Sequence, residues 1–192
     1  MNRWTLLIVV VCSVVAMAML IGHTIHHRSA KRRRSIPTAT RLQVLRDLLA
    51  FVSGVAAEDP PLHPFLLYGT LLGWVRSRNF ICYDFDVDIG VYGEHEYETL
   101  LERLKRAMTG TAFTVTRYRV LPSLGGCDYF KVLHAATGLN LDVFVFVPTE
   151  GGMARCRFPA WYKVHYYGEC ADAVPVDWIL PLSSDHLCDM PV

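Results

Sequence analysis

Three aspartates at every second position form the strongest chemical signal in this sequence. Asp84, Asp86 and Asp88 lie in the run Asp-Phe-Asp-Val-Asp-Ile-Gly-Val, with apolar residues between and after them. Because residues two apart share one face of a β-strand, the three carboxylates are predicted to point the same way and the aliphatic side chains into the core. Like charges on one face raise one another's pKa unless a cation lies between them. Hard oxygen ligands suit Mg²⁺ or Mn²⁺, so the pattern predicts a divalent-cation site.

A further aspartate lies in a second apolar segment. Asp142 is the one acid in the run Leu-Asn-Leu-Asp-Val-Phe-Val-Phe at residues 139–146. Burying a carboxylate in such a strand is costly unless it is paired or binds a metal. If this strand lies beside Asp86 and Asp88, acids from two strands can hold a metal and leave positions for substrate phosphates. The alternative is an edge strand with solvated acids, which is the better interpretation of a single Asp-x-Asp but a poorer one of this longer pattern.

A Gly-Thr pair precedes the acidic run. Gly69 and Thr70 follow a short apolar stretch, residues 65–68, and lead into a brief helical segment, residues 71–76. Glycine at a strand-to-helix turn allows backbone N–H groups to approach a phosphate, and a helix N-terminus favours an anion. A Gly-Thr turn alone is weak evidence. Together with the acidic strand it predicts a phosphate-binding turn beside a metal site.

The elements that must position these groups alternate along the chain. Apolar periodicity and turn residues predict a helix over 38–53, a strand over 65–68, a helix over 71–76, a strand over 84–92, a helix over 94–108, and strands over 113–121, 128–136 and 139–147. A turn at Thr137-Gly138 joins the last two strands as a hairpin. This order predicts an α/β (α+β) domain with a mixed sheet and flanking helices.

The near-neutral charge of the chain is an average over two unlike parts. The 192 residues have a formal charge of +1 and a mean hydropathy of +0.25. Residues 1–34 hold six Lys or Arg and no acid, whereas residues 35–192 hold 13 Lys or Arg against 18 Asp or Glu. We therefore predict a basic N-terminal unit, residues 1–34, and one acidic domain, residues 35–192. The charge argues against a nucleic-acid partner.

An uncharged apolar run occupies residues 4–22. As a helix, nineteen residues would extend roughly 28 Å, close to the thickness of a bilayer's hydrocarbon core. The run is predicted to be a single transmembrane helix that anchors the protein in a membrane. The alternative is a cleaved signal peptide with Ala16-Met17-Ala18 as its cleavage site. The basic flank from Lys31 to Arg34 favours a cytosolic domain under the positive-inside rule.

Residues 68–90 resemble the LicD/fukutin family. Tyr-Gly-Thr-Leu-Leu-Gly-Trp-Val-Arg at 68–76 and Phe-Ile-Cys-Tyr-Asp-Phe-Asp-Val-Asp-Ile-Gly at 80–90 are similar to that family's pattern. The family pattern is G-T-L-L-G-x-x-R, a short loop, and a hydrophobic residue followed by P-W-D-x-D-x-D-I-G. The resemblance covers roughly residues 65–182, with Cys-Tyr in place of the family's Pro-Trp. The family's acceptor-side region usually continues beyond the position of Val192, so part of it is expected to be missing from this sequence.

The resemblance implies a nucleotidyltransferase-type fold and transfer of a phospho-alcohol from a CDP-linked donor to a hydroxyl of a glycan or glycoprotein. Phosphocholine and ribitol phosphate are the family's familiar cargoes. The resemblance implies catalytic and metal-binding roles for Asp86, Asp88 and Asp142. It implies that Gly69 and Thr70 face a phosphate and that Arg76 acts as a charge partner. Asp84 would be a supporting acid, and Lys131 would contact the donor. A structural surface role is equally compatible with Lys131.

Other functions share parts of this pattern. A nucleotidyltransferase would have the same Gly-Thr turn and acids, while a glycosyltransferase with an Asp-x-Asp motif would explain neither the turn nor Asp142. A membrane-anchored binding protein of the same fold, without turnover, is the alternative from outside the enzymes. The resemblance also implies a domain in the lumen of the Golgi or the endoplasmic reticulum, in conflict with the charge of the flank that ends at Arg34.

Overall fold

The computed structural model describes Met17 and residues 33–120, 127–156, 173–180, 186–187 and 190–191. The chain divides into two compact units, Met1–Ile36 and Pro37–Val192. Apart from Met17, the predicted transmembrane helix lies outside the described residues. Within the described part of the chain, no helix is both long enough and apolar enough to cross a membrane.

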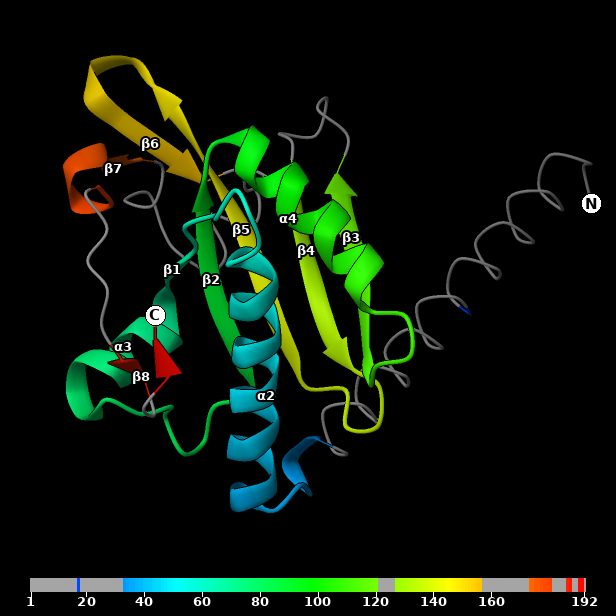
Figure 1. Cartoon of the computed structure of the whole chain (residues 1–192). Coiled ribbons are helices and arrows are strands. Elements are labelled where there is room, and N and C mark those ends of the chain that lie inside the picture. The colour runs from blue at the N-terminus through cyan, green and yellow to red at the C-terminus, as the bar shows by residue number, and fades with distance from the viewer. Residues whose placement is uncertain are drawn as a thin grey trace, which may run out of the picture. The chain divides into compact units, whose positions relative to one another are not determined.

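The second unit is a mixed α/β domain whose elements largely follow the predicted order (Figure 1). Its helices and strands are α2 (Thr38–Ala56), β1 (Phe65–Leu66), α3 (Tyr68–Ser77), β2 (Asp86–Tyr92), α4 (Glu94–Ala107), β3 (Phe113–Val120), β4 (Cys127–His134), β5 (Asn140–Thr149), β6 (Met153–Cys156), β7 (Val174–Pro175), β8 (His186–Leu187) and β9 (Met190–Pro191). Two short 3₁₀ helices, η2 (Glu150–Gly152) and η3 (Val176–Trp178), complete the order.

The main sheet runs in the order β1-β2-β5-β4-β3, and β6 and β7 extend it from the end of β5. β2 and β5 are parallel, whereas the other described pairs are antiparallel. The predicted hairpin between β4 and β5 is confirmed. Gly138 has a φ of 73°, a left-handed value that glycine adopts without strain, and its N–H donates to the His134 carbonyl at 2.8 Å. Because the same sheet contains both a parallel pair and antiparallel pairs, the prediction of a mixed sheet is also correct.

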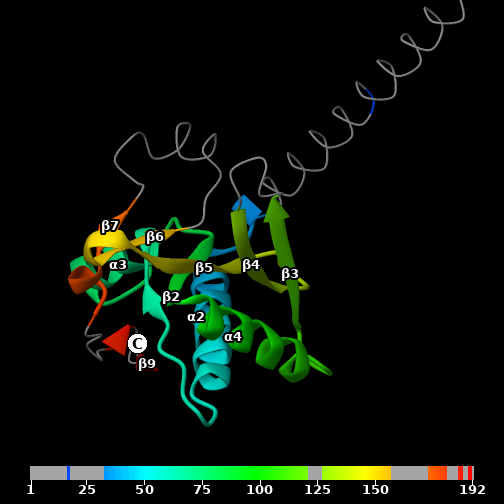
Figure 2. The same ribbon diagram turned by 90° about the horizontal axis from the view of Figure 1, so that it is seen from above.

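Helices α2 and α4 cover one face of this sheet (Figures 1 and 2). The ring of Tyr97 on α4 lies 5.1 Å from that of Phe130 on β4, which identifies the face toward the helices. The aliphatic side chains of β2 point to the same face, as predicted, and are essentially buried. Fully burying such side chains contributes about 1.5–3 kcal/mol each. The core under the helices includes Leu45, Leu48, Val52, Val87, Ile89, Val91, Leu100, Leu101, Leu104, Leu141 and Val143.

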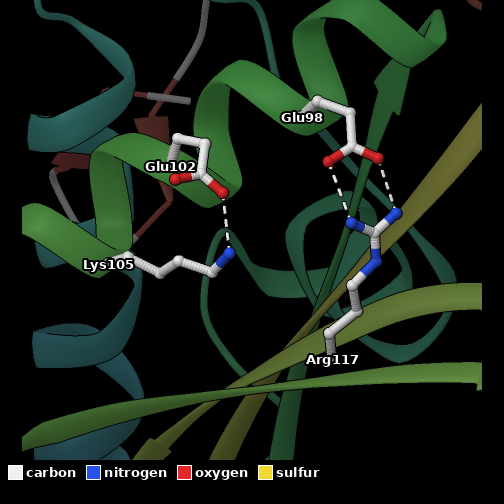
Figure 3. Close-up of polar contacts among 4 residues, drawn as sticks. All are labelled: Glu98, Glu102, Lys105 and Arg117. Atoms are coloured by element: carbon white, nitrogen blue, oxygen red, sulfur yellow. Dashed lines mark hydrogen bonds and ion pairs between the residues drawn. The ribbon is translucent and has the colours of Figure 1, made fainter.

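An ion pair joins α4 to the strand at the edge of the sheet. The two terminal nitrogens of Arg117 on β3 donate to the two carboxylate oxygens of Glu98, at 2.9 and 2.5 Å (Figure 3). Arg117 therefore points to the helix side of the sheet. Because side chains alternate along a strand, its neighbours Thr116 and Tyr118 point to the opposite face, on which the acids lie.

Strand β2 begins two residues later than predicted. It starts at Asp86, and the N–H of Asp84 instead donates to the Ile81 carbonyl at 3.0 Å, which places Asp84 at the end of a turn. The prediction that all three aspartates share one strand face is therefore wrong for Asp84. The Gly-Thr pair also differs from expectation, because Gly69 and Thr70 lie inside the first turn of α3 rather than before it.

Candidate active site

Three carboxylates meet on the face of the sheet opposite α2 and α4. Asp86 and Asp88 come from β2, and Asp142 comes from the parallel strand β5, where it is the direct register partner of Asp88. One carboxylate oxygen from each residue lies within 4.8 Å of the others. Asp142 is buried and the other two are half-buried. The pairing of β2 with β5 thus brings together the three acids predicted to act as a group, and such hard oxygen donors fit Mg²⁺ or Mn²⁺.

The cluster carries more negative charge than its surroundings compensate. Burial, together with the nearby carboxylates of Asp86 and Asp142, raises the pKa of Asp88 to about 8. Burial also raises the pKa of Asp142, while Lys131 opposes that rise. Near neutral pH the cluster therefore holds at least one proton in a place that a divalent cation can take.

Both oxygens of Asp142 have partners. Lys131, its register partner on β4, donates from Nζ to Oδ2 at 2.7 Å. The Nδ2 group of Asn140 donates to Oδ1 at 2.6 Å. These two contacts hold the Asp142 carboxylate in one orientation, because each of its oxygens accepts from a different strand position.

Asn140 is a site residue that the sequence analysis did not identify. Its side chain is fully buried, and its Oδ1 atom has no hydrogen-bond partner among the described residues. An unpaired buried acceptor is costly to stability, so the link of Asn140 to the site is its Nδ2 contact with Asp142. The signal was present in the sequence: an Asn-x-Asp pattern places Asn140 and Asp142 on one strand face.

Thr70 connects helix α3 to the acidic strand. Its hydroxyl accepts a hydrogen bond from the N–H of Asp88 at 2.9 Å, and the residue is only 1% exposed. The hydroxyl therefore holds the backbone of β2 next to the carboxylates. A phosphate-facing role for this position, which the sequence suggested, rests on the backbone N–H groups of the first helical turn and stays a prediction.

Gly69 allows Asp84 to approach the same helix end. A Cβ atom at Gly69 would lie 2.7 Å from the Oδ2 atom of Asp84, so the missing side chain is what admits this carboxylate. A negative group at a helix N-terminus is electrostatically favourable. Burial and the nearby carboxylate of Asp86 together raise the pKa of Asp84 to about 6. Asp84 thus lies beside the three-carboxylate cluster without belonging to it.

A buried arginine supports the turn that carries Asp84, and the sequence analysis did not identify it. Arg41 on α2 is 6% exposed and donates from Nη2 to the Cys82 carbonyl. Its guanidinium lies 4.6 Å from the centre of the Phe85 ring. The available signal was a basic residue one turn before Leu45 on the apolar face of a predicted helix.

The structure does not bring Arg76 to the acids. It lies exposed in the last turn of α3, and its side chain makes no hydrogen bond or ion pair within the described part of the chain. Its predicted pairing with the acidic strand is therefore not among the described contacts. A contact with a substrate phosphate stays a prediction.

The chain folds into a mixed α/β domain with three clustered carboxylates, as the family resemblance of the sequence leads us to expect. The comparison with protein families agrees, because the family model described as "LicD/FKTN/FKRP, nucleotidyltransferase domain" matches residues 62–192. The chain belongs to the LicD/FKTN/FKRP family. The match includes every acid described above, as well as Gly69, Thr70 and Lys131.

Two curated relatives carry the same name. The proteins called "Ribitol 5-phosphate transferase FKRP" from Homo sapiens and Mus musculus are each 30% identical to this chain over 115 residues. The matched part is 59% of this chain and 22% of each relative. The chain therefore corresponds to a minor part of these longer relatives.

Proposed function

We propose that this chain transfers a phospho-alcohol from a CDP-linked donor to a hydroxyl group of a glycan or glycoprotein. The observation that carries the proposal is the register of β2 and β5, which gathers Asp86, Asp88 and Asp142 in a domain of the LicD/FKTN/FKRP family. The name of the two relatives supports phospho-alcohol transfer, with ribitol 5-phosphate as the first cargo to test. Phosphocholine, the family's other familiar cargo, is the second.

The carboxylates of Asp86, Asp88 and Asp142 would hold Mg²⁺ or Mn²⁺. Asn140 supports this assignment, because its Nδ2 group donates to Oδ1 of Asp142 and helps to hold that carboxylate in place. When bound, the ion would supply charge neutralisation and Lewis acidity at the pyrophosphate of the donor. The N–H groups at the first turn of α3, around Gly69, would bind phosphate oxygens.

Asp84 is the acid best suited to accept a proton. Its pKa of about 6 is near the working range of a general base, and it lies outside the three-carboxylate cluster. In the proposed reaction, the oxygen of the acceptor hydroxyl bonds to the phosphorus that carries the alcohol, and the bond from this phosphorus to the bridging oxygen breaks. CMP leaves with that oxygen, and the hydroxyl proton passes to Asp84.

The decisive experiment supplies CDP-ribitol or CDP-choline with Mg²⁺ and a panel of glycan acceptors, and measures CMP release and labelled glycan. We expect acceptor-dependent CMP release that a chelator abolishes. Release of pyrophosphate from CTP would instead identify a nucleotidyltransferase, and transfer of a sugar would identify a glycosyltransferase. Binding of CDP without turnover would identify a non-catalytic binding protein and contradict the proposal.

For the location, we propose a single-pass membrane protein with its domain in the lumen of the Golgi or the endoplasmic reticulum. Glycan acceptors in the secretory pathway support a lumenal domain, whereas the flank from Lys31 to Arg34 favours a cytosolic domain. Protease treatment of sealed microsomes distinguishes the two locations. A protected domain is expected, and complete digestion without detergent would contradict the proposal.

A further inference from the structure

Lys131 forms an ion pair inside the acid cluster. Its Nζ atom lies 2.7 Å from Oδ2 of Asp142, and its side chain is 23% exposed, whereas that of Asp142 is 10% exposed. The same Nζ lies 5.7 Å from the centre of the Tyr129 ring. Lys131 is therefore a partly accessible cation at the rim of the cluster, attached to the most buried of the three carboxylates.

This ion pair competes with a metal ion. Asp142 contributes one of the three carboxylate oxygens that lie within 4.8 Å of one another. The ammonium group of Lys131 therefore neutralises a negative charge that would otherwise attract a divalent cation. A divalent cation at Asp86 and Asp88 would also be repelled by the ammonium nearby. Lys131 is thus expected to weaken the binding of a metal ion that arrives without a substrate.

A nucleoside diphosphate changes this balance. Its phosphates add negative charge next to the metal, and an ammonium group donates strong, charge-assisted hydrogen bonds to phosphate oxygens. The flexible four-carbon stem of a lysine allows its ammonium to move while the Cα stays in the sheet. Thr116, the register partner of Lys131 on β3, is exposed, so the sheet face beside the ammonium remains accessible.

We propose that Lys131 is an exchangeable cation of the donor site. Its ammonium group pairs with Asp142 when the site is empty. When a divalent cation and a nucleoside diphosphate bind together, the ammonium group moves away from Asp142 and pairs with a phosphate of the donor. The inference rests on the proposed function, because it takes the donor to be a CDP-linked alcohol. It makes Lys131 a residue that couples metal binding to donor binding.

The test measures two affinities of the full chain, purified in detergent. The first is for Mn²⁺ alone, and the second is for CDP at saturating Mg²⁺, both by calorimetric titration. In Lys131→Met, which removes the charge and keeps a long apolar stem, the Mn²⁺ affinity should rise about tenfold and the CDP affinity should fall about tenfold. Each change corresponds to about 1.4 kcal/mol of binding free energy.

The chain offers a matched control. Lys105 on α4 makes an ion pair of the same length, 2.7 Å, with Glu102 on the helix surface (Figure 3). Lys105→Met should change neither affinity. Lys131→Arg keeps the positive charge, so both affinities should lie closer to those of the wild type than the affinities of Lys131→Met do.

The opposite signs of the two changes separate exchange from a structural role. If both affinities fall in Lys131→Met, Lys131 only holds Asp142 in place and the proposal is wrong; two unchanged affinities also overturn it. If Lys131→Met does not fold by circular dichroism, Lys131→Gln must show the same pair of opposite shifts. A wild-type chain that binds Mn²⁺ but no CDP would refute the proposed function, and the exchange with it, whereas CDP binding without opposite shifts refutes the exchange alone.

Discussion

Asp88 and Asp142 lie directly opposite each other on the parallel strands β2 and β5. One oxygen of each carboxylate lies within 4.8 Å of an oxygen of the other. Burial, then the charges of Asp86 and Asp142, raise the pKa of Asp88 to about 8. Two acids in register on adjacent strands are unfavourable for folding unless a proton or a cation lies between them. The consequences of this pairing for activity, pH dependence and stability can each be measured.

Replacing Asp88 with asparagine should abolish transfer. The variant removes one of three clustered carboxylates while keeping the size of the side chain, so the fold should remain. We expect CMP release from the CDP-linked donor to fall about thousandfold, equivalent to about 4 kcal/mol of transition-state stabilisation. Asp47→Asn, an exposed substitution on α2, is the control and should retain full activity. Turnover close to wild type in Asp88→Asn would remove the cluster from the mechanism.

The metal-free protein should lose stability as the pH rises. Folded Asp88 keeps its proton up to a pH of about 8, whereas the unfolded residue loses it near its ordinary value of 3.8. Between these values the folded state binds more protons, so the free energy of unfolding falls by up to about 1.4 kcal/mol per pH unit for this group. Thermal unfolding from pH 5 to pH 8 measures the trend.

The same titration should link pH to metal binding. A cation needs ionised carboxylates, so Mg²⁺ should raise the melting temperature more at pH 8 than at pH 6. In Asp88→Asn the fall in stability with pH should be smaller, because the variant lacks the titrating group. An equal pH dependence in wild type and variant would show that Asp88 titrates normally.

Thr70→Val should damage the site through the backbone. Valine has the shape of threonine but cannot accept the hydrogen bond from the N–H of Asp88, which would be left buried and unpaired. We expect a loss of about 1–3 kcal/mol in the free energy of unfolding, measured in urea, and weaker Mn²⁺ binding. Thr70→Ser keeps the hydroxyl and should bind Mn²⁺ as the wild type does. Equal metal affinity in the valine variant would contradict a positioning role.

Alanine at Gly69 should affect activity more than stability. The new Cβ would lie 2.7 Å from the Asp84 carboxylate, which is the end of a flexible side chain and can move aside. If Asp84 accepts the proton, its displacement should lower kcat about tenfold. Gly54→Ala on α2 is the matched control, because nothing lies within 4 Å of its Cβ. It should leave kcat unchanged and add about 0.5–1 kcal/mol of stability. Equal kcat in both variants would exclude this role of Asp84.

Local sequence patterns predicted much of the fold and the core of the site. Alternation of acids and aliphatic residues on β2 predicted both the face of Asp86 and Asp88 and the burial of their neighbours, because a strand has a period of two. Thr137-Gly138 predicted the hairpin through the backbone freedom of glycine. The pattern failed at Asp84, where a turn extends two residues into the alternating run and takes the residue out of the strand.

The sequence by itself determined the types of chemical group, their spacing along each element and the family resemblance, since these depend on neighbouring residues. Only the tertiary structure decided which groups meet. The parallel pairing of β2 with β5 set Asp88 opposite Asp142, and antiparallel pairing with β4 added Lys131. Tertiary packing also placed the buried hydroxyl of Thr70 where it accepts a hydrogen bond from the backbone N–H of Asp88. Strand order, register and burial arise from packing across the whole domain, so no local pattern could specify them.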